Sequence, residues 1–222
     1  MLQNADYIAF DKVGLADIFM TVGDNSLFMM CERLNVDACS ILPDGYTFRQ
    51  VRRDELEIWK RTIVDVQYVD YVTEYYDNIY AAKADEFFRR CIFVCDGNDK
   101  PVASCMLWRA YGQIETLGWL RVLPEYEKMG IGRALISEIL KAAEFPVYLH
   151  TQLTSICAVK LYSDFGFALV TDPVIGYRKN YLQESLPYMQ KILPKADYHN
   201  LRFVQADEAL LKAALSSKTS EF

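Results

Sequence analysis

One stretch limits the possible folds of this chain more than any other. An apolar run from Ile114 to Val122 leads through Pro124 to two glycines, Gly130 and Gly132, which open a segment with helical apolar spacing. The first N–H groups of a helix have no partner within it, and the helix dipole adds positive charge there. Glycines let a ligand approach the backbone closely. This order of strand, loop and helix indicates an anion site.

Two common phosphate loops do not match this stretch. A dinucleotide-binding fingerprint requires a third small residue three positions after Gly132, where the chain has Leu135. A P-loop ends in Gly-Lys-Ser or Gly-Lys-Thr, and neither follows the glycines here. The G-x-G spacing also occurs at helix starts that bind nothing, so this segment taken alone favours a tight strand-to-helix turn without a ligand.

The remaining pattern predicts an α/β (α+β) fold with a mixed, partly antiparallel central sheet flanked by helices. Apolar periodicity predicts helices at 26–34, 54–66, 71–90, 132–143 and 155–165, the third of them interrupted. Asp24 or Asn25 would cap the first of these helices. Strands are predicted at 46–49, 91–95, 101–108, 114–122, 147–150, 167–170 and 174–181. The second and third strands form a hairpin, and the last two close the domain as another.

Composition excludes several classes of function. A net charge of −6 argues against binding nucleic acid, which clustered Lys and Arg would neutralise. No apolar run approaches the roughly 18–20 residues that span a bilayer, and the N-terminus lacks a signal-peptide pattern, so we expect a cytoplasmic protein that does not enter membranes. Six cysteines without a C-x-x-C pair and only two histidines predict buried free thiols and no metal site.

The chain divides into three parts by pattern. We expect a partly helical N-terminal extension at 1–43, a core domain at 44–181 and a C-terminal extension at 182–222. Within the last part, 198–204 is compatible with a strand and 207–215 with a helix. This extension either packs on the core domain or completes a homodimer.

Two separated motifs resemble the GCN5-related N-acetyltransferases (GNAT). The first is Leu-x-Val-x-Pro-Glu-Tyr from Leu120 to Tyr126, ahead of the glycines. The second is Ala-x-x-Leu-Tyr-x-x-x-Gly-Phe from Ala158 to Phe167. The element order agrees over 44–181, closely at 117–135 and 155–167. The resemblance implies the GNAT acyl-CoA N-acyltransferase fold and transfer of an acetyl group from acetyl-CoA to a primary amine, in a small molecule or a peptide, by direct attack in a ternary complex.

The resemblance also implies where acetyl-CoA binds. The strand that carries Leu120, Arg121 and Val122 would splay from its neighbour and bind the pantetheine arm with its backbone. Ser155 or Thr154 would add a hydrogen bond, although N-capping explains a hydroxyl there equally well. The pyrophosphate would lie on the backbone amides of the loop that follows this strand. The loop consists of Glu127, Lys128, Met129, Gly130, Ile131, Gly132 and Arg133, and it departs from the family pattern at the first two of them.

Candidate catalytic groups follow from the same resemblance. Tyr162 would protonate the leaving thiolate, unless it serves only to pack its helix. The Val122 N–H would stabilise the oxyanion. Glu115 lies one residue from the position of a glutamate base in some relatives, so it fits only if a β-bulge intervenes. Otherwise it is a solvated strand-end carboxylate, and water accepts the proton of the amine.

Other residues admit two readings. Cys157 could be a catalytic nucleophile. A buried, unreactive thiol is favoured, because no base is positioned beside it. The tyrosines between 71 and 80, with Trp59 and Trp108, line an amine pocket or belong to the core. Two rival functions also stay open. One is a non-catalytic acyl-CoA-binding module, and the other is a nucleotide-binding protein.

Overall fold

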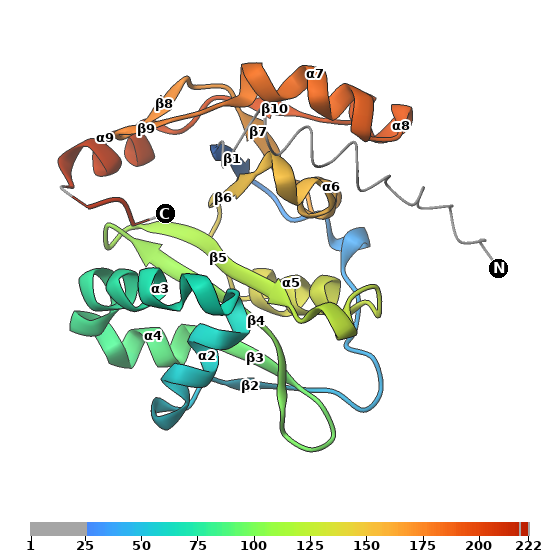
Figure 1. Ribbon diagram of the computed structural model, residues 1–222. Coiled ribbons are helices and arrows are strands. Elements are labelled where there is room, and N and C mark those ends of the chain that lie inside the picture. Colours follow the sequence, from blue (N-terminus) through green and yellow to red (C-terminus); the bar gives the residue numbers. More distant parts are fainter. Residues whose placement is uncertain (1–25, 218, 222) are drawn as a thin grey trace.

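A computed structural model describes residues 26–217 and 219–221, and their central feature is an eight-stranded mixed sheet with strand order β10-β7-β1-β6-β5-β4-β3-β2 (Figure 1). A separate two-stranded sheet pairs β8 with β9. The α/β prediction with a mixed central sheet is confirmed. The strands are β1 Ser26–Cys31, β2 Thr47–Gln50, β3 Cys91–Cys95, β4 Pro101–Ala110, β5 Ile114–Val122, β6 Val147–Gln152, β7 Ala168–Val170, β8 Val174–Ile175, β9 Arg178–Lys179 and β10 Phe203–Val204.

Helices cover both faces of the sheet, and each face has its own hydrophobic core. The first face, called here the α5 face, packs α5, α6 and α7 around Leu117, Ile136 and Phe167. The second, the α3 face, packs α2, α3, α4 and α9 around Trp59 and Trp108. The α-helices are α2 Leu56–Ile63, α3 Val69–Tyr75, α4 Ala84–Arg90, α5 Ile131–Lys141, α6 Ile156–Asp164, α7 Leu182–Ile192, α8 Lys195–His199 and α9 Glu208–Ser216.

The predicted helix at 26–34 is wrong. Residues 26–31 form β1, which lies inside the sheet, antiparallel to β6 on one side and to β7 on the other. Every side chain of β1 is buried because both faces of the sheet are covered, so its residues show no polar alternation. The N-cap expected at Asp24 or Asn25 lies outside the described residues. The segment read as an N-terminal extension therefore contributes an interior strand.

The predicted closing hairpin between 167–170 and 174–181 is also wrong. β7 pairs with β1 and with β10, while β8 pairs with β9 on the α3 face. The predicted strand at 198–204 shortens to β10, because α8 occupies the preceding residues. The hairpin of β3 and β4 and the helix at 207–215 are confirmed. The interrupted helical region at 71–90 is confirmed as well, with one π-helical turn, Tyr76–Tyr80, between α3 and α4.

Candidate functional site

The centre of the sheet opens where β5 and β6 part. These strands are parallel and pair only from Glu115↔Val147 to Leu117↔Leu149. Beyond Leu117, β5 keeps its pairing with β4 but has an irregular register, with Trp119 at a φ of 55°. This bulge turns β5 away from β6. We call the opening between residues 118–122 of β5 and 150–152 of β6 the fork. Its presence agrees with the splay that the resemblance implies.

Backbone groups of β5 line the fork. The Leu123 N–H donates to the Val102 carbonyl on β4, at 2.8 Å. Amides alternate in direction along a strand, so the Val122 N–H points to the opposite side, toward the fork. The direction of the Val122 N–H is compatible with the role of oxyanion donor that the resemblance implies for it.

The loop between β5 and α5 leaves a row of backbone amides without partners. The Glu127 N–H donates to the Pro124 carbonyl at 3.3 Å, and the first helical bond of α5 runs from the Ala134 N–H to the Gly130 carbonyl at 3.0 Å. Between them, no N–H of residues 128–133 donates to another residue in the described part of the chain. We call these amides the cradle. Residues 128–130 are exposed, Gly132 and Arg133 are half-buried and Ile131 is buried, at the N-terminus of α5, where an anion is favoured.

Unusual backbone conformations shape the cradle. Gly130 has a φ of 85° and caps α5, while Lys128 adopts a φ of 61°, a conformation that costs a side chain energy. Left-handed residues beside helical ones turn successive N–H groups into a concave anion site. A Cβ on Gly132 would come within 3.3 Å of the Val122 side chain, so glycine permits the close contact of α5 with β5.

The basic side chains around the loop are not all directed at it. Arg133 donates to Asp164 at 2.7 Å and to the Ala38 carbonyl at 3.2 Å, and its guanidinium lies over the Phe165 ring. It therefore ties α5 to α6, and only its backbone amide belongs to the cradle. Arg121 is paired with Asp65. Lys128, Met129 and Glu127 are exposed at the cradle.

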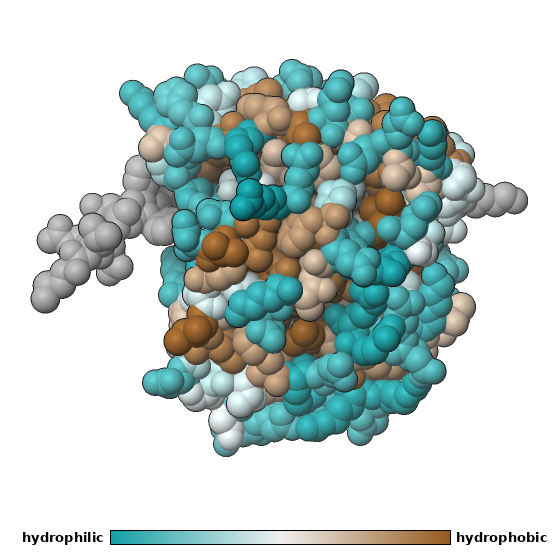
Figure 2. Space-filling view, turned by 180° about the vertical axis from the view of Figure 1, so that it is seen from behind, coloured by the Kyte–Doolittle hydropathy of each residue, from teal (hydrophilic) through white to brown (hydrophobic). Residues whose placement is uncertain are grey.

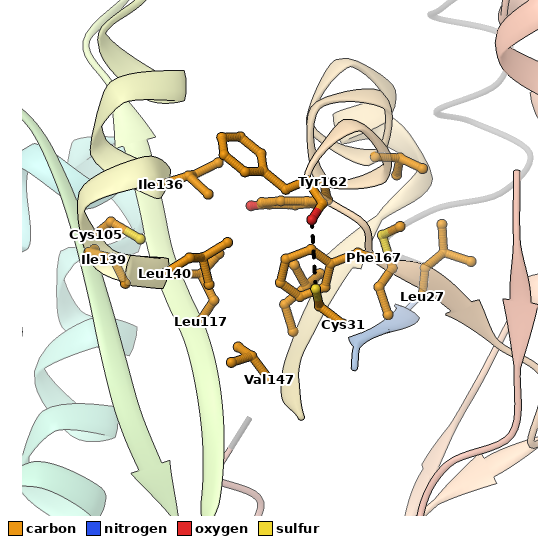
Figure 3. Close-up of a cluster of buried hydrophobic side chains, with 14 of the residues drawn as sticks. Leu27, Cys31, Cys105, Leu117, Ile136, Ile139, Leu140, Val147, Tyr162 and Phe167 are labelled. Atoms are coloured by element: carbon orange, nitrogen blue, oxygen red, sulfur yellow. Dashed lines mark hydrogen bonds between the residues drawn. The ribbon is translucent and has the colours of Figure 1, made fainter. Parts of the chain in front are cut away.

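Tyr162 projects from α6 toward Ile136 and Leu140 of α5, within the core of the α5 face (Figure 3). The side chain is only 7% exposed, and its hydroxyl makes no hydrogen bond to any of the residues that the structure describes. Burial, with a smaller effect of the Cys105 thiol, raises the pKa of Tyr162 well above its usual value. That thiol donates to the carbonyl of Gly118, the first fork residue, at 3.5 Å. Tyr162 is thus a protonated phenol near the fork.

Glu115 lies elsewhere. It is 5% exposed at the paired end of β5, where its carboxylate accepts from Arg109 at 2.9 Å and from Arg90 at 3.4 Å. A role for Glu115 as a base requires a β-bulge. The pairing of β4 with β5 contains one, between Glu115 and the cradle. The carboxylate is nevertheless held in an ion-pair network that also includes Glu86 and Glu144. This arrangement favours a structural role for Glu115. Its carboxylate is buried, so the expectation of a solvated strand-end carboxylate is wrong.

The polar and thiol residues of α6 have simpler surroundings. Ser155 stands at the N-cap position and is exposed, without a side-chain capping bond. Cys157 is exposed, so the prediction of a buried thiol there is wrong, whereas Cys31, Cys91, Cys95 and Cys105 are buried and free. Within residues 26–217 and 219–221, no group of three or more His, Cys, Asp or Glu is placed to hold a metal. No described helix has the length and apolar character to cross a membrane.

The α3 side of the fork is lined by aromatic rings. Trp119 packs against Tyr75, with ring centroids 5.4 Å apart, and its Nε1 donates to the Tyr80 hydroxyl at 2.8 Å. Trp59, Tyr80 and Trp108 are buried, so most of the predicted pocket aromatics belong to the core. Tyr75 is half-buried and stands beside the fork. Trp119 was not singled out from the sequence, because a bulge has no local signature.

His150 belongs to β6, the other strand of the fork. It is the first residue of β6 beyond the last pair with β5, and its ring packs on Phe28, with centroids 5.7 Å apart. Arg178 of β9 donates to His150 Nε2 at 2.8 Å and to Ser26 Oγ at 3.0 Å. Burial, aided by the charge of Arg178, lowers the pKa of His150 to about 3. The imidazole is therefore neutral at physiological pH, with Nε2 as an acceptor.

His150 should make stability depend on pH. In the unfolded chain its pKa is near 6.5, and in the folded protein it is about 3, so the unfolded state binds the extra proton between these values. The free energy of unfolding should consequently fall as pH drops through this window, by about 2 kcal/mol at pH 5 from this residue alone. Chemical denaturation of His150→Gln should show a flatter profile between pH 7 and pH 5. The same change at exposed His199 is the matched control, and an unaltered slope in His150→Gln would contradict the assignment.

Comparison with protein families gives one match. The model of the "Acetyltransferase (GNAT) family" matches residues 51–167, more than half of the 222 residues. The match includes the fork, the cradle and α6, but not β1 or Arg178. A search of curated proteins found no match.

Solved structures of similar shape include several acetyltransferases. A Drosophila protein is 16% identical with a TM-score of 0.45, over 75% of this chain and 56% of that one. A GNAT-family acetyltransferase from Staphylococcus aureus Mu50 is 16% identical with a TM-score of 0.40, over 54% and 81%. One from Colwellia psychrerythraea is 16% identical with a TM-score of 0.49, over 65% and 52%. The chain spans little more than half of the Drosophila protein, and these scores add nothing to the family match.

Proposed function

The chain belongs to the GNAT acetyltransferase family, and from that premise we propose that it transfers the acetyl group of acetyl-CoA to a primary amine by direct attack in a ternary complex. The observation that carries the proposal is the cradle. Six successive amides, those of residues 128–133, have no hydrogen-bond partner among the described residues at the start of α5, and Gly132 lets the helix pack closely against Val122. A pyrophosphate is a ligand of matching charge and size.

The fit extends from the cradle toward the fork. Seen from behind, hydrophobic residues gather in the middle of the molecule with hydrophilic ones around them (Figure 2). We propose that the uncharged pantetheine arm runs from the cradle to the fork along the backbone of residues 120–122 of β5. When bound, acetyl-CoA supplies a thioester whose carbonyl carbon is open to a neutral amine.

Each chemical requirement then has a candidate in this chain. The Val122 N–H points into the fork and would donate to the oxygen that gains charge during attack. Tyr162 keeps its proton at Oη and would pass it to the sulfur as the carbon–sulfur bond breaks. Glu115 is held by two arginines, so we assign the proton of the attacking amine to water.

A non-catalytic acyl-CoA-binding module is the second candidate. The observation that favours it is Glu127, whose carboxylate is exposed at the cradle and would repel a pyrophosphate. The two candidates agree on binding and differ on turnover.

One experiment separates them. We expect acetyl-CoA and CoA to raise the melting temperature of the full chain, whereas ATP and NAD should not. A panel of primary amines with acetyl-CoA should then release free CoA, detected with a thiol reagent. Stabilisation without release from any amine would favour the binding module. Stabilisation by ATP or NAD alone would refute both candidates.

A further inference from the structure

The fork has two sides, and the proposed function uses only one of them. The cradle and Tyr162 belong to the α5 face, which we assign to acetyl-CoA. The acceptor must therefore arrive from the α3 face. On that side the fork residue Trp119 packs on Tyr75, with ring centroids 5.4 Å apart, and Tyr75 packs on Tyr71, with centroids 6.2 Å apart. A row of three aromatic rings thus leads from the fork along α3.

A recess of about 160 Å³ opens at the far end of this row, between α3 and the C-terminal tail, which we define as residues 219–221. An apolar cavity of about 150 Å³ can hold a benzene ring, so the recess has room for one small group of a ligand. Among the described residues that line it there are two aromatic rings and one carboxylate, and none is basic. The lining residues are Tyr71, Glu74, Tyr75, Asn78, Ile79, Thr219 and Ser220.

Hydrogen bonds hold the tail in place as one wall of the recess. Glu221 Oε2 accepts from Trp108 Nε1 at 3.2 Å and from the Tyr111 backbone N–H at 2.9 Å. The Glu221 N–H donates to the Tyr111 hydroxyl at 3.3 Å, and the Tyr75 hydroxyl donates to the Ser220 carbonyl at 3.5 Å. Since Trp108 is buried, these bonds fix the tail to the core of the α3 face. The tail lies outside the part of the chain that the family model matches, so the family does not imply this wall.

The charge of the recess favours a cation. Glu74 is exposed, and its carboxylate makes no hydrogen bond or ion pair with the part of the chain that the structure describes. A carboxylate beside the rings of Tyr71 and Tyr75 attracts an ammonium group, because the faces of aromatic rings are also negative. Two further charges act on Tyr75 in opposite senses, the positive charge of Arg178 and the negative charge of Glu221. Glu74 is the one charged group that lines the recess itself.

We propose that this recess binds a second, cationic group of the acceptor, so that the substrates are diamines or polyamines. This inference rests on the proposed function. The amine in the recess keeps its proton and lies beside Glu74, while the amine at the fork attacks in its neutral form. The alkyl chain between them would lie along the rings of Tyr75 and Trp119 and bury its methylene groups there.

Matched acceptor pairs test the proposal. Diamines of increasing chain length are compared with monoamines of the same chain lengths, as acceptors for the full chain with saturating acetyl-CoA. We expect kcat/KM to be about tenfold higher for the diamine than for the monoamine at the length that spans from the recess to the fork. Glu74→Gln should lower kcat/KM for that diamine by on the order of fivefold. Because Glu74 is exposed, added salt should reduce the preference, and Glu74→Gln should lose this salt dependence.

Two further variants separate the recess from a general effect of charge. Asp77→Asn removes a neighbouring exposed carboxylate that does not line the recess, and it should leave the preference for diamines intact. Thr219→Trp fills the recess from the tail without a change of charge, and it should abolish the preference. Each variant must keep the thermal shift caused by CoA, which shows that it is folded and that the cradle is unaffected.

Binding and turnover are read separately. Titration calorimetry of the CoA-bound protein with each amine should show tighter binding of the diamines, weakened in Glu74→Gln. Equal kcat/KM for diamine and monoamine at every chain length would overturn the subsite, as would a preference that survives both Glu74→Gln and Thr219→Trp. Tighter binding of diamines without turnover of any amine would instead defeat the proposed function and leave the recess as a cation site.

Discussion

Replacing Gly132 with proline should weaken acetyl-CoA binding by about 100-fold, because it removes one cradle amide and places ring atoms where the pyrophosphate would lie. A charge-assisted hydrogen bond contributes about 1.5–3 kcal/mol, and the steric conflict adds to this loss. Proline is tolerated in the first turn of a helix, where the missing N–H had no partner. The added Cβ requires only a small shift of Val122, at 3.3 Å. Titration calorimetry with acetyl-CoA measures the effect.

A proline at the equivalent position of another helix is the matched control. Gln183 is the second residue of α7, as Gly132 is of α5, and it is exposed. Gln183→Pro should bind acetyl-CoA as the unmodified protein does. If Gly132→Pro kept full affinity while folded, the cradle would not be the phosphate site, and the proposed function would lose its main support.

Replacing Tyr162 with phenylalanine should lower kcat by about 100-fold with little change in acetyl-CoA affinity. Proton transfer by a positioned side chain contributes about 10²- to 10⁴-fold to a rate. The hydroxyl has no partner among the described residues, so its removal breaks no hydrogen bond within that part of the chain. Steady-state kinetics, with CoA binding measured separately, distinguishes the two quantities.

Tyr76 provides the control for this change. It is also 7% exposed, but it belongs to the core of the α3 face. Tyr76→Phe should leave kcat unchanged, and any loss of stability that the two variants share would reflect packing. An unchanged kcat in Tyr162→Phe would remove this residue from the mechanism and leave water as the proton donor.

The elements with a clear period and a clear boundary could be predicted from sequence. β5 has the predicted bounds, and α5 begins within one residue of the prediction, because glycines mark its start. β1 could not be predicted. A short apolar run that is buried on both faces has no alternation, and Leu27, Met30 and Leu34 happen to match helical spacing.

Some features of the site could also be predicted from sequence, and others could not. The cradle depends on backbone amides within one local motif, so a short stretch of sequence contains its signal. The ion pair of Arg133 with Asp164 and the contact of His150 with Arg178 join residues 31 and 28 positions apart. Such contacts depend on the tertiary fold, which periodicity does not encode. The α3 side of the fork was therefore missed.

The position of β1 has a consequence for how the protein folds. Its two neighbours, β6 and β7, are joined to it across more than 110 residues, for example Ser26 with Gln152 and Met29 with Leu169. During synthesis, the apolar side chains of β1 stay exposed to solvent until both β6 and β7 have left the ribosome. Contacts of such long range slow folding and lengthen exposure to aggregation. The final assembly of the sheet is therefore a late step, and it brings Ser26 and Phe28 to the fork together with His150.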